Sequence, residues 1–325
     1  MGDVVKAKIL VLRFSSIGDI VLTTPVLRVL EDQLNGGAEI HFVVKKKFES
    51  VVVHNPRIAK VFAFEKTVQE ILPALMEEGY DYIIDLQNNV RSRIIKRRLK
   101  SLAFSVDKRN FAKFLWVQWG VKGHISHIVE RYLQTLKTLG LKDDGKGLEF
   151  YIQPEDEIPN QWGKYTAVPI GATYFGKRPD AAHWRKILEQ IPGPIVLLGG
   201  KEDMEVAGKL EDLPQVFNGV GIWSLGQSAS VLKNASLVIC GDTGLMHIAS
   251  AFQRSIISLW GCTRPGLGMY PWRPGKDSLQ LEPEGRGTKP CSKLGNHCKH
   301  GEGDRCIHHL PLNQLKSAAE KILLA

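Results

Sequence analysis

The sequence predicts an α/β protein built from two doubly wound domains. Short apolar runs bounded by polar residues and glycine alternate with amphipathic helical segments along the chain, as buried parallel strands alternate with helices. The alternation is interrupted once, at 142–160, where charged residues, glycine and proline accumulate. Strands and helices alternate again after this segment. The length of 325 residues also favours two domains. Such alternation produces mostly parallel sheets covered by helices on both faces.

In the first half, strands are expected where four to six mainly apolar residues follow one another, and helices where apolar residues recur every three or four positions. The expected strands are 8–13, 39–44, 60–64, 80–85 and 102–106. The expected helices are 20–34, 68–78, 91–100, 111–119 and 127–139. Helix 91–100 is unusually basic, with six lysines and arginines.

The second half repeats the pattern. Its expected strands are 167–170, 195–198, 236–240 and 256–259, and its expected helices are 179–190, 202–213, 228–234, one that begins at Asp242, and 311–324. The segment 285–304 is expected to be irregular. We therefore predict an N-terminal domain (1–155), a C-terminal domain (160–310) and a closing helix (311–325), for which packing back on the N-terminal domain is one option.

Charge is unevenly distributed along the chain. The formal net charge is +9; residues 1–150 carry 24 Lys and Arg against 17 Asp and Glu, a net +7, which leaves +2 for the remainder. This excess indicates an anionic partner of the first half, such as a phosphorylated lipid, a membrane surface or nucleic acid, although a solvated basic face is the commoner explanation. The start of the chain lacks a secretory pattern, and no apolar run has bilayer length, so we expect a cytoplasmic protein.

Two strand–turn–helix units carry the candidate chemistry. In 236–261, Asp242 takes the helix N-cap position, and the following Thr243 and Gly244 leave free N–H groups at a helix start, which suits a phosphate. An ordinary βαβ unit is the alternative. In 14–19, Asp19 lies at the junction of loop and helix, either as a cap or as a carboxylate that projects into a cleft.

Several nucleotide-binding and metal-binding signatures are absent from the sequence. There is no G-x-G-x-x-G after the first strand, no Walker A loop and no D-x-D pair. A bound diphosphate would therefore be neutralised by side-chain cations and helix N-termini rather than by a metal ion.

The five cysteines are odd in number, which argues against a closed set of disulfides. Cys240 falls in a strand, where we interpret it as a small apolar residue. Cys291, Cys298 and Cys306 share a segment rich in glycine and histidine, which leaves open a zinc knot or a loop with reduced thiols. Because no tight C-x-x-C pair is present, we predict the loop, with no metal and no cofactor.

The sequence resembles glycosyltransferase family nine, the ADP-heptose:lipopolysaccharide heptosyltransferases, in four segments. They are FSSIGDIVLTTPVLRVL (14–30), DLQNNVRS (85–92), GATYFGKRPDAAHW (171–184) and GDTGLMHIASAF (241–252). Their order and separation match over nearly the whole chain. The resemblance implies a GT-B fold, in which two Rossmann-like doubly wound domains face a central cleft, and an inverting transferase that works without a metal-bound D-x-D.

The resemblance also implies roles for individual residues. Asp19 corresponds to the general base that takes the proton of the acceptor hydroxyl. The predicted nucleotide-sugar-binding residues are Lys177, Arg178, Asp242, Thr243, Gly244, Leu245 and His247. The predicted acceptor-binding residues are Ser15, Ser16, Gly18, Asn88 and Arg91. For His247, packing inside the helix layer is an equally good interpretation.

The implied partners are ADP-heptose or a similar nucleotide sugar, a phosphorylated lipid-linked saccharide acceptor and the inner membrane surface, with no nucleic acid. The function expected first is heptose transfer to a lipopolysaccharide core. A related transferase with another sugar or acceptor stays open, because Gly226 and Gln227 stand where many members of the family carry a glutamate. A non-enzymatic basic RNA-binding protein is the third hypothesis, although no RNA-binding module signature appears.

Overall fold

The computed structural model describes residues 6–324 and divides the chain into two compact units. The first unit comprises Met1–Lys108 and Ile128–Tyr151, and the second comprises Arg109–His127 and Ile152–Ala325. Residues 109–127 therefore group with the second unit, although they were expected in the N-terminal domain (1–155). Within the described part of the chain, no helix combines the length and the apolar character that a bilayer crossing requires.

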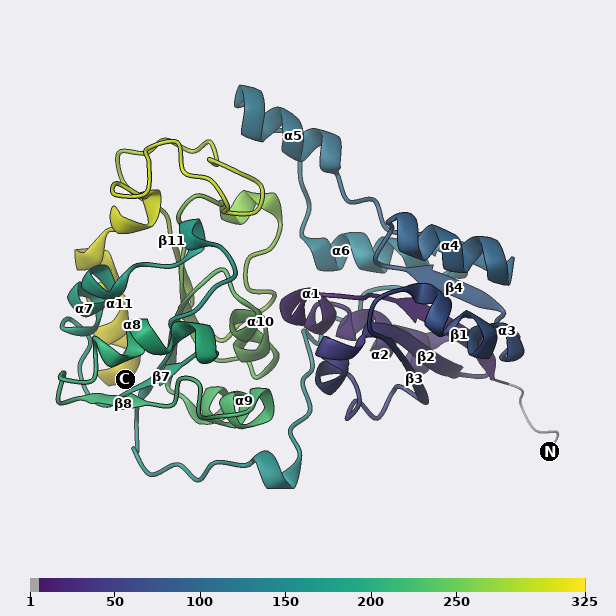
Figure 1. The fold of residues 1–325 in the computed structure, drawn as a ribbon, viewed down its shortest axis with the longest axis horizontal. Helices are drawn as coiled ribbons and strands as arrows, with labels where there is room; N and C mark the ends of the chain where they lie inside the picture. The colour runs from purple at the N-terminus through teal and green to yellow at the C-terminus, as the bar shows by residue number, and fades with distance from the viewer. Residues whose placement is uncertain (1–5, 325) are drawn as a thin grey trace. The chain divides into compact units, whose positions relative to one another are not determined.

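The first unit is built on a five-stranded parallel sheet with the order β3-β2-β1-β4-β5 (Figure 1). The strands are β1 (Ala7–Leu12), β2 (Ala38–Lys45), β3 (Lys60–Phe64), β4 (Tyr82–Asp85) and β5 (Leu102–Ser105). The helices are α1 (Ile17–Val21), α2 (Thr24–Gln33), α3 (Leu72–Glu77), α4 (Val90–Leu99) and α6 (Ile128–Leu133). All five predicted strands are present.

The second unit is built on a six-stranded parallel sheet with the order β11-β10-β9-β6-β7-β8. The strands are β6 (Thr166–Pro169), β7 (Ile195–Leu198), β8 (Val216–Asn218), β9 (Leu237–Gly241), β10 (Ser255–Leu259) and β11 (Leu279–Leu281). The helices are α5 (Asn110–Trp119), α7 (Ala181–Leu188), α8 (Met204–Gly208), α9 (Leu225–Asn234), α10 (Gly244–Ala251) and α11 (Leu312–Leu324). The short outer strands β8 and β11 were not predicted.

Several predicted helices are shorter than expected. The expected helix 20–34 is two helices, because α1 ends at Val21 and α2 begins at Thr24 with a proline in its first turn. The expected helices 68–78, 127–139 and 202–213 each combine a 3-10 turn with a short α-helix. The apolar spacing of these segments did not reveal the change of helix type.

Each sheet is buried against its own helices. Strands β1 and β4 contribute fully buried Leu10, Leu12 and Ile83 to the core of the first unit. The closing helix α11 belongs to the second unit: Leu315 and Ala319 lie in the core that contains β9 and β10. The closing helix, for which packing on the first domain was left open, is thus grouped with the second unit.

Both sheets reverse their strand order once. In the first unit the chain builds β1, β2 and β3 outward in one direction, then returns to add β4 on the other side of β1. In the second unit the same reversal lies between β6 and β9. Ligands of open α/β sheets bind beyond the carboxyl ends of the strands at this reversal. The loops after β1, β4, β6 and β9 are therefore the places to look for function.

Candidate active site

In the second unit, the loops after β6 and β9 bring Lys177 and Asp242 together. Lys177 ends the 3-10 turn Phe175–Lys177, and its Nζ lies 2.7 Å from Asp242 Oδ2. Both side chains are mostly buried, at 17% and 11% exposed. Gly241 allows this approach, because a Cβ at that position would lie 2.2 Å from the carbonyl oxygen of Lys177. Lys177, which was predicted to bind the nucleotide sugar, thus lies where the strand order of the second sheet reverses.

The start of α10 lies beside this pair. The N-cap is Thr243, in extended conformation, and not Asp242 as predicted. Asp242 lies one residue earlier, and its carboxylate pairs with Lys177 and accepts from Thr263 Oγ1 at 3.5 Å. The side chain of Thr243 makes no capping hydrogen bond. The first N–H groups of α10 therefore form a site of partial positive charge next to an ammonium group.

The other residues predicted to bind the nucleotide sugar also follow strands of the second sheet, but their surroundings differ. Arg178 donates to Asp203 Oδ1 at 2.6 Å, in the loop after β7. Burial raises the pKa of Asp203, while the N–H of Gly200 and the charge of Arg178 oppose that shift. Leu245 is half-buried, whereas His247 is only 2% exposed. Its burial favours the packing interpretation of His247.

A carboxylate also lies at the start of α9, where Gly226 and Gln227 replace the expected glutamate. Ser224 Oγ donates to Asp156 Oδ1 at 2.7 Å. A Cβ on Gly226 would lie 1.9 Å from Asp156 Oδ2, so the glycine makes room for this side chain. Asp156, from the linker before β6, therefore lies directly beside the start of α9.

In the first unit, Asp19 lies in α1 within the loop that follows β1. Ser16 is the N-cap of α1, and its N–H and Oγ donate to Asp19 Oδ2 at 3.3 Å and 3.0 Å. The other oxygen, Oδ1, lies 2.7 Å from Arg13 Nη2. The side chain is 22% exposed. Asp19 is therefore both a capping residue and an accessible carboxylate, so the two interpretations of the sequence do not exclude each other.

Arg13 fixes the position of this carboxylate. It is 8% exposed, and it donates to the carbonyl oxygens of Ser15 at 2.9 Å and Leu86 at 2.8 Å. Burial opposes its charged form, but the Asp19 carboxylate and the phenol of Tyr132 more than compensate, so the pKa of Arg13 lies above its usual value. The Arg13 guanidinium thus holds the Asp19 carboxylate in place through a charge-assisted contact. Arg13 was not predicted as a site residue, although its place at the end of an otherwise apolar strand is a signal in the sequence.

The loop after β4, the strand next to β1, is hydrogen-bonded to the loop that carries Asp19. Phe14 N–H donates to Gln87 Oε1 at 2.9 Å, which joins the β1 and β4 loops. Asp85 is fully buried and accepts from Asn88 N–H at 2.6 Å and Ser92 Oγ at 2.8 Å. Asn88 adopts a positive φ of 39°. The predicted acceptor residues Ser15, Ser16, Gly18 and Asn88 therefore lie in two connected loops.

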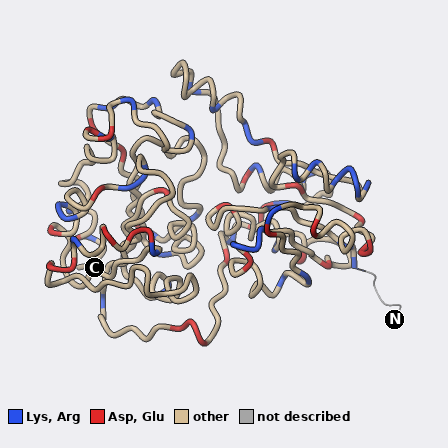
Figure 2. Tube along the Cα trace, viewed as in Figure 1, with Lys and Arg blue, Asp and Glu red and all other residues tan. Residues whose placement is uncertain are grey.

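Arg91 and the basic helix α4 extend from this loop. Asn89 caps α4, since its side chain accepts from Ser92 N–H at 3.0 Å. Arg91, the second residue of α4, is exposed, and further basic residues continue along the helix (Figure 2). Lys96 is different, because it pairs with buried Asp85 at 2.8 Å. Most of the helix thus presents positive charge to solvent, while Lys96 stabilises the loop.

The comparisons with known proteins decide the family. The family model described as "Glycosyltransferase family 9 (heptosyltransferase)" matches residues 68–299. The chain belongs to glycosyltransferase family 9. It is therefore an enzyme, and the non-enzymatic RNA-binding hypothesis is wrong.

Curated relatives of this family 9 chain carry lipopolysaccharide heptosyltransferase names. Lipopolysaccharide heptosyltransferase 1 of Pseudomonas aeruginosa is 26% identical, with 94% of this chain and 92% of that protein covered. The Escherichia coli K12 protein of the same name is 25% identical, with 80% and 89% covered.

Solved structures of the family share the fold. A family 9 glycosyltransferase from Veillonella parvula superposes with a TM-score of 0.77 at 20% identity, covering 98% of this chain and 97% of that one. The structure of E. coli heptosyltransferase WaaC with ADP gives a TM-score of 0.68 at 24% identity, covering 97% and 99%. The expected GT-B fold is confirmed.

Proposed function

We propose that this enzyme transfers heptose from ADP-heptose to a lipopolysaccharide core acceptor, with inversion at the anomeric carbon. The observation that carries the proposal is the Lys177–Asp242 pair beside the start of α10, at the strand reversal of the second sheet. An ammonium group and free helix N–H groups together suit a diphosphate. The names of the relatives support heptose as the sugar.

The transfer is a single displacement at the anomeric carbon. The acceptor hydroxyl oxygen forms the new bond to that carbon while the bond to the diphosphate oxygen breaks, and the electron pair of the broken bond leaves with ADP. Negative charge therefore grows on the diphosphate in the transition state. Lys177 and the N–H groups of Thr243 and Gly244 stabilise that charge because they are already in place before the reaction.

The proton of the acceptor hydroxyl goes to Asp19. Its Oδ1 is held by Arg13 and its Oδ2 by Ser16, so the carboxylate has a fixed orientation. A positioned general base of this kind raises the rate because proton removal strengthens the attacking oxygen. Arg91 and the exposed basic residues of α4 attract the phosphates of the acceptor.

The proposed function is tested by a transfer assay with the purified enzyme, ADP-heptose and a heptose-free core acceptor. We expect product only with the ADP sugar and a change of anomeric configuration by NMR. In parallel, ADP is expected to raise the melting temperature more than GDP or UDP, because a ligand that binds the native state stabilises it. Transfer from a GDP or UDP sugar, with no response to ADP, would assign the enzyme to the alternative substrate class.

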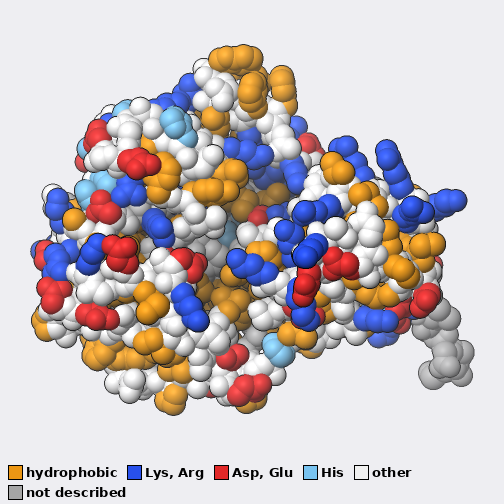
Figure 3. Space-filling view, in the orientation of Figure 1, with side chains coloured by type: hydrophobic (Ala, Val, Ile, Leu, Met, Phe, Trp, Pro, Cys, Tyr) orange, Lys and Arg blue, Asp and Glu red, His pale blue; other side chains and the backbone are white. Residues whose placement is uncertain are grey.

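We also propose that helix α5 contacts a membrane surface that contains anionic lipid. The helix exposes Phe111, Phe114 and Trp119, at 73%, 49% and 67% of their surfaces. Hydrophobic side chains gather on this helix (Figure 3). Lys289 and Lys293 hold its two ends by donating to Gln118 O and Asn110 Oδ1, both at 2.7 Å. Aromatic residues next to lysines are typical of segments that lie in the lipid headgroup region.

Replacing Phe111 and Trp119 together by serine is expected to reduce binding to vesicles by about tenfold or more, because aromatic area no longer enters the interface. Co-sedimentation with phosphatidylcholine vesicles, with and without phosphatidylglycerol, measures the effect and its dependence on anionic lipid. Phe217→Ser is the matched control, since Phe217 is also exposed, at 44%, in β8 of the same unit. Equal binding by the double variant would contradict the proposal. A wild-type dimer that this variant abolishes would instead make α5 a contact between two copies.

A further inference from the structure

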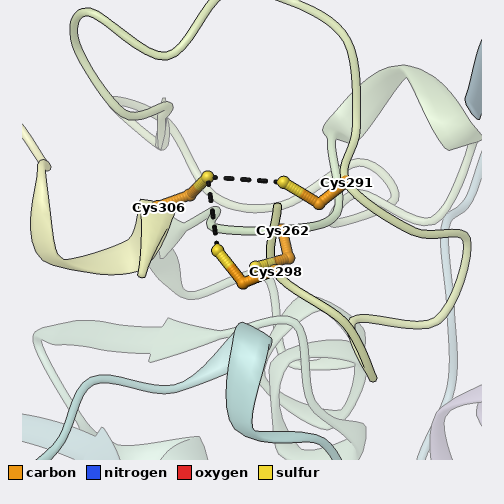
Figure 4. Close-up of side chains that lie close together, drawn as sticks. All are labelled: Cys262, Cys291, Cys298 and Cys306. Carbon is orange, nitrogen blue, oxygen red and sulfur yellow. Dashed lines mark hydrogen bonds between the residues drawn. The ribbon is translucent and has the colours of Figure 1, made fainter. Parts of the chain in front are cut away.

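Four of the five cysteines converge in the second unit. Cys262 follows β10, Cys291 and Cys298 lie in the irregular segment, and Cys306 begins the 3-10 turn before α11. The four Sγ atoms lie within 4.8 Å of one another, and Cys306 Sγ lies 3.5 Å from that of Cys291 and 4.0 Å from that of Cys298 (Figure 4). All four side chains are nearly or fully buried. Cys262 was not predicted to lie with the other three.

The spacing of the sulfur atoms fits a tetrahedral ion. Metal–sulfur bonds of about 2.3 Å place the corners of a tetrahedron about 3.8 Å apart. The separations of Cys306 Sγ from Cys291 Sγ and from Cys298 Sγ, 3.5 Å and 4.0 Å, lie on either side of that value. All five cysteines are free thiols. In iron–sulfur clusters the four thiolates are shared among two or four iron atoms, and thiolates on different iron atoms lie farther apart than the 4.8 Å within which all four sulfur atoms lie here.

We propose that Cys262, Cys291, Cys298 and Cys306 bind a single zinc or iron ion. Four thiolates in tetrahedral arrangement select these metals over calcium or magnesium, which require oxygen ligands. A divalent ion with four thiolates carries a net charge of −2, which a buried site must offset. Arg286 lies close to Cys298 and Cys306, and the backbone N–H of Lys299 donates to Cys291. The surroundings therefore suit a charged metal–thiolate centre.

The site would stabilise the turn that presents Lys177, a consequence that rests on the proposed function. Gly176 N–H donates to Gly295 O at 3.0 Å, and Cys262 N–H donates to Gly176 O at 2.9 Å. A Cβ on Gly176 would lie 2.8 Å from Cys262 Sγ, so the turn packs directly on the cysteine cluster. Arg305, next to Cys306, donates to Phe175 O at 3.0 Å. The metal would therefore fix the loop against which Lys177 is placed.

Elemental analysis of the untagged wild-type protein tests the proposal, with zinc and iron measured separately. We expect close to one equivalent of one metal per chain. Cys298→Ser and Cys306→Ser are expected to lose most of it, whereas Cys240→Ala, a buried cysteine of β9 outside the cluster, keeps it. A colourless zinc protein and a coloured iron protein with thiolate-to-iron absorption are the two supporting outcomes.

A second measurement keeps the proposal testable if the serine variants do not fold. Wild-type protein stripped by a chelator under reducing conditions is titrated with Co²⁺, for which we expect the absorption of a tetrahedral thiolate site and a rise in melting temperature of several degrees. Substoichiometric metal after growth in supplemented medium, together with no Co²⁺ absorption, would overturn the site. Recovery of two disulfides from the freshly purified protein would overturn it as well. Metal content does not depend on the donor, so failure of the proposed function leaves this test intact.

Discussion

Replacement of Asp19 by asparagine is expected to lower kcat for glycosyl transfer by about 10²- to 10⁴-fold, the usual contribution of a positioned general base. The asparagine keeps the size of the side chain and an oxygen that accepts from Ser16, but it cannot take the proton of the acceptor hydroxyl. Steady-state kinetics with saturating donor and acceptor measure the loss. Donor affinity, measured by calorimetry with ADP, is expected to stay within about twofold, because Asp19 belongs to the other unit.

Two controls separate a chemical role of Asp19 from a structural one. Loss of its charge leaves Arg13 with the carbonyl oxygens of Ser15 and Leu86 as partners, so some loss of stability is expected and is measured as a change in melting temperature. Asp81→Asn is the matched variant, since Asp81 also accepts a backbone N–H in the first unit and lies at the opposite end of the strands. It should retain wild-type turnover. An Asp19→Asn enzyme that folds normally and keeps more than about a tenth of its turnover would remove Asp19 from the chemistry.

The arrangement of the site was largely predictable because it follows from chain direction. In parallel sheets every strand ends at the same edge, so loops that follow apolar runs must gather there. The family resemblance implied that Lys177 and Asp242 both bind the nucleotide sugar, and in the structure their side chains lie 2.7 Å apart. The sequence did not distinguish which residue caps α10, because Asp242 and Thr243 both suit an N-cap position. In the structure Thr243 is the N-cap, and Asp242 pairs with Lys177.

The parts that were missed depend on contacts between residues far apart in the sequence. Arg13 meets Leu86 across 73 residues, and Cys262 meets Cys306 across 44. Zinc signatures are recognised by two tight pairs, whereas these four cysteines are spread over separate segments. Their convergence follows from the packing of the irregular segment against the Phe175–Lys177 turn, which no local pattern encodes. Strands β8 and β11 were missed for a simpler reason, since three residues give no readable period.

Replacement of Lys177 by methionine is expected to weaken ADP binding by about 10- to 100-fold and to lower kcat by about 10²-fold or more. Methionine keeps the unbranched side chain that packs against Gly295 but removes the ammonium group. The Asp242 carboxylate, only 11% exposed, then faces the diphosphate with its partner gone. The loss in kcat is expected because negative charge on the diphosphate is greater in the transition state than in the bound donor. Calorimetry with ADP and steady-state kinetics separate the two effects.

The pair also predicts how a second substitution acts. In the double variant Lys177→Met/Asp242→Asn, ADP affinity should recover part of its loss, because the unpaired carboxylate that repels the diphosphate is gone, whereas kcat should stay low since no cation returns. Lys186→Met is the matched control, an exposed lysine on α7 of the same unit, and it should behave as wild type. If Lys177→Met bound ADP normally, the diphosphate would lie elsewhere. If the double variant were weaker than both single variants, Asp242 would bind the donor directly instead of orienting Lys177.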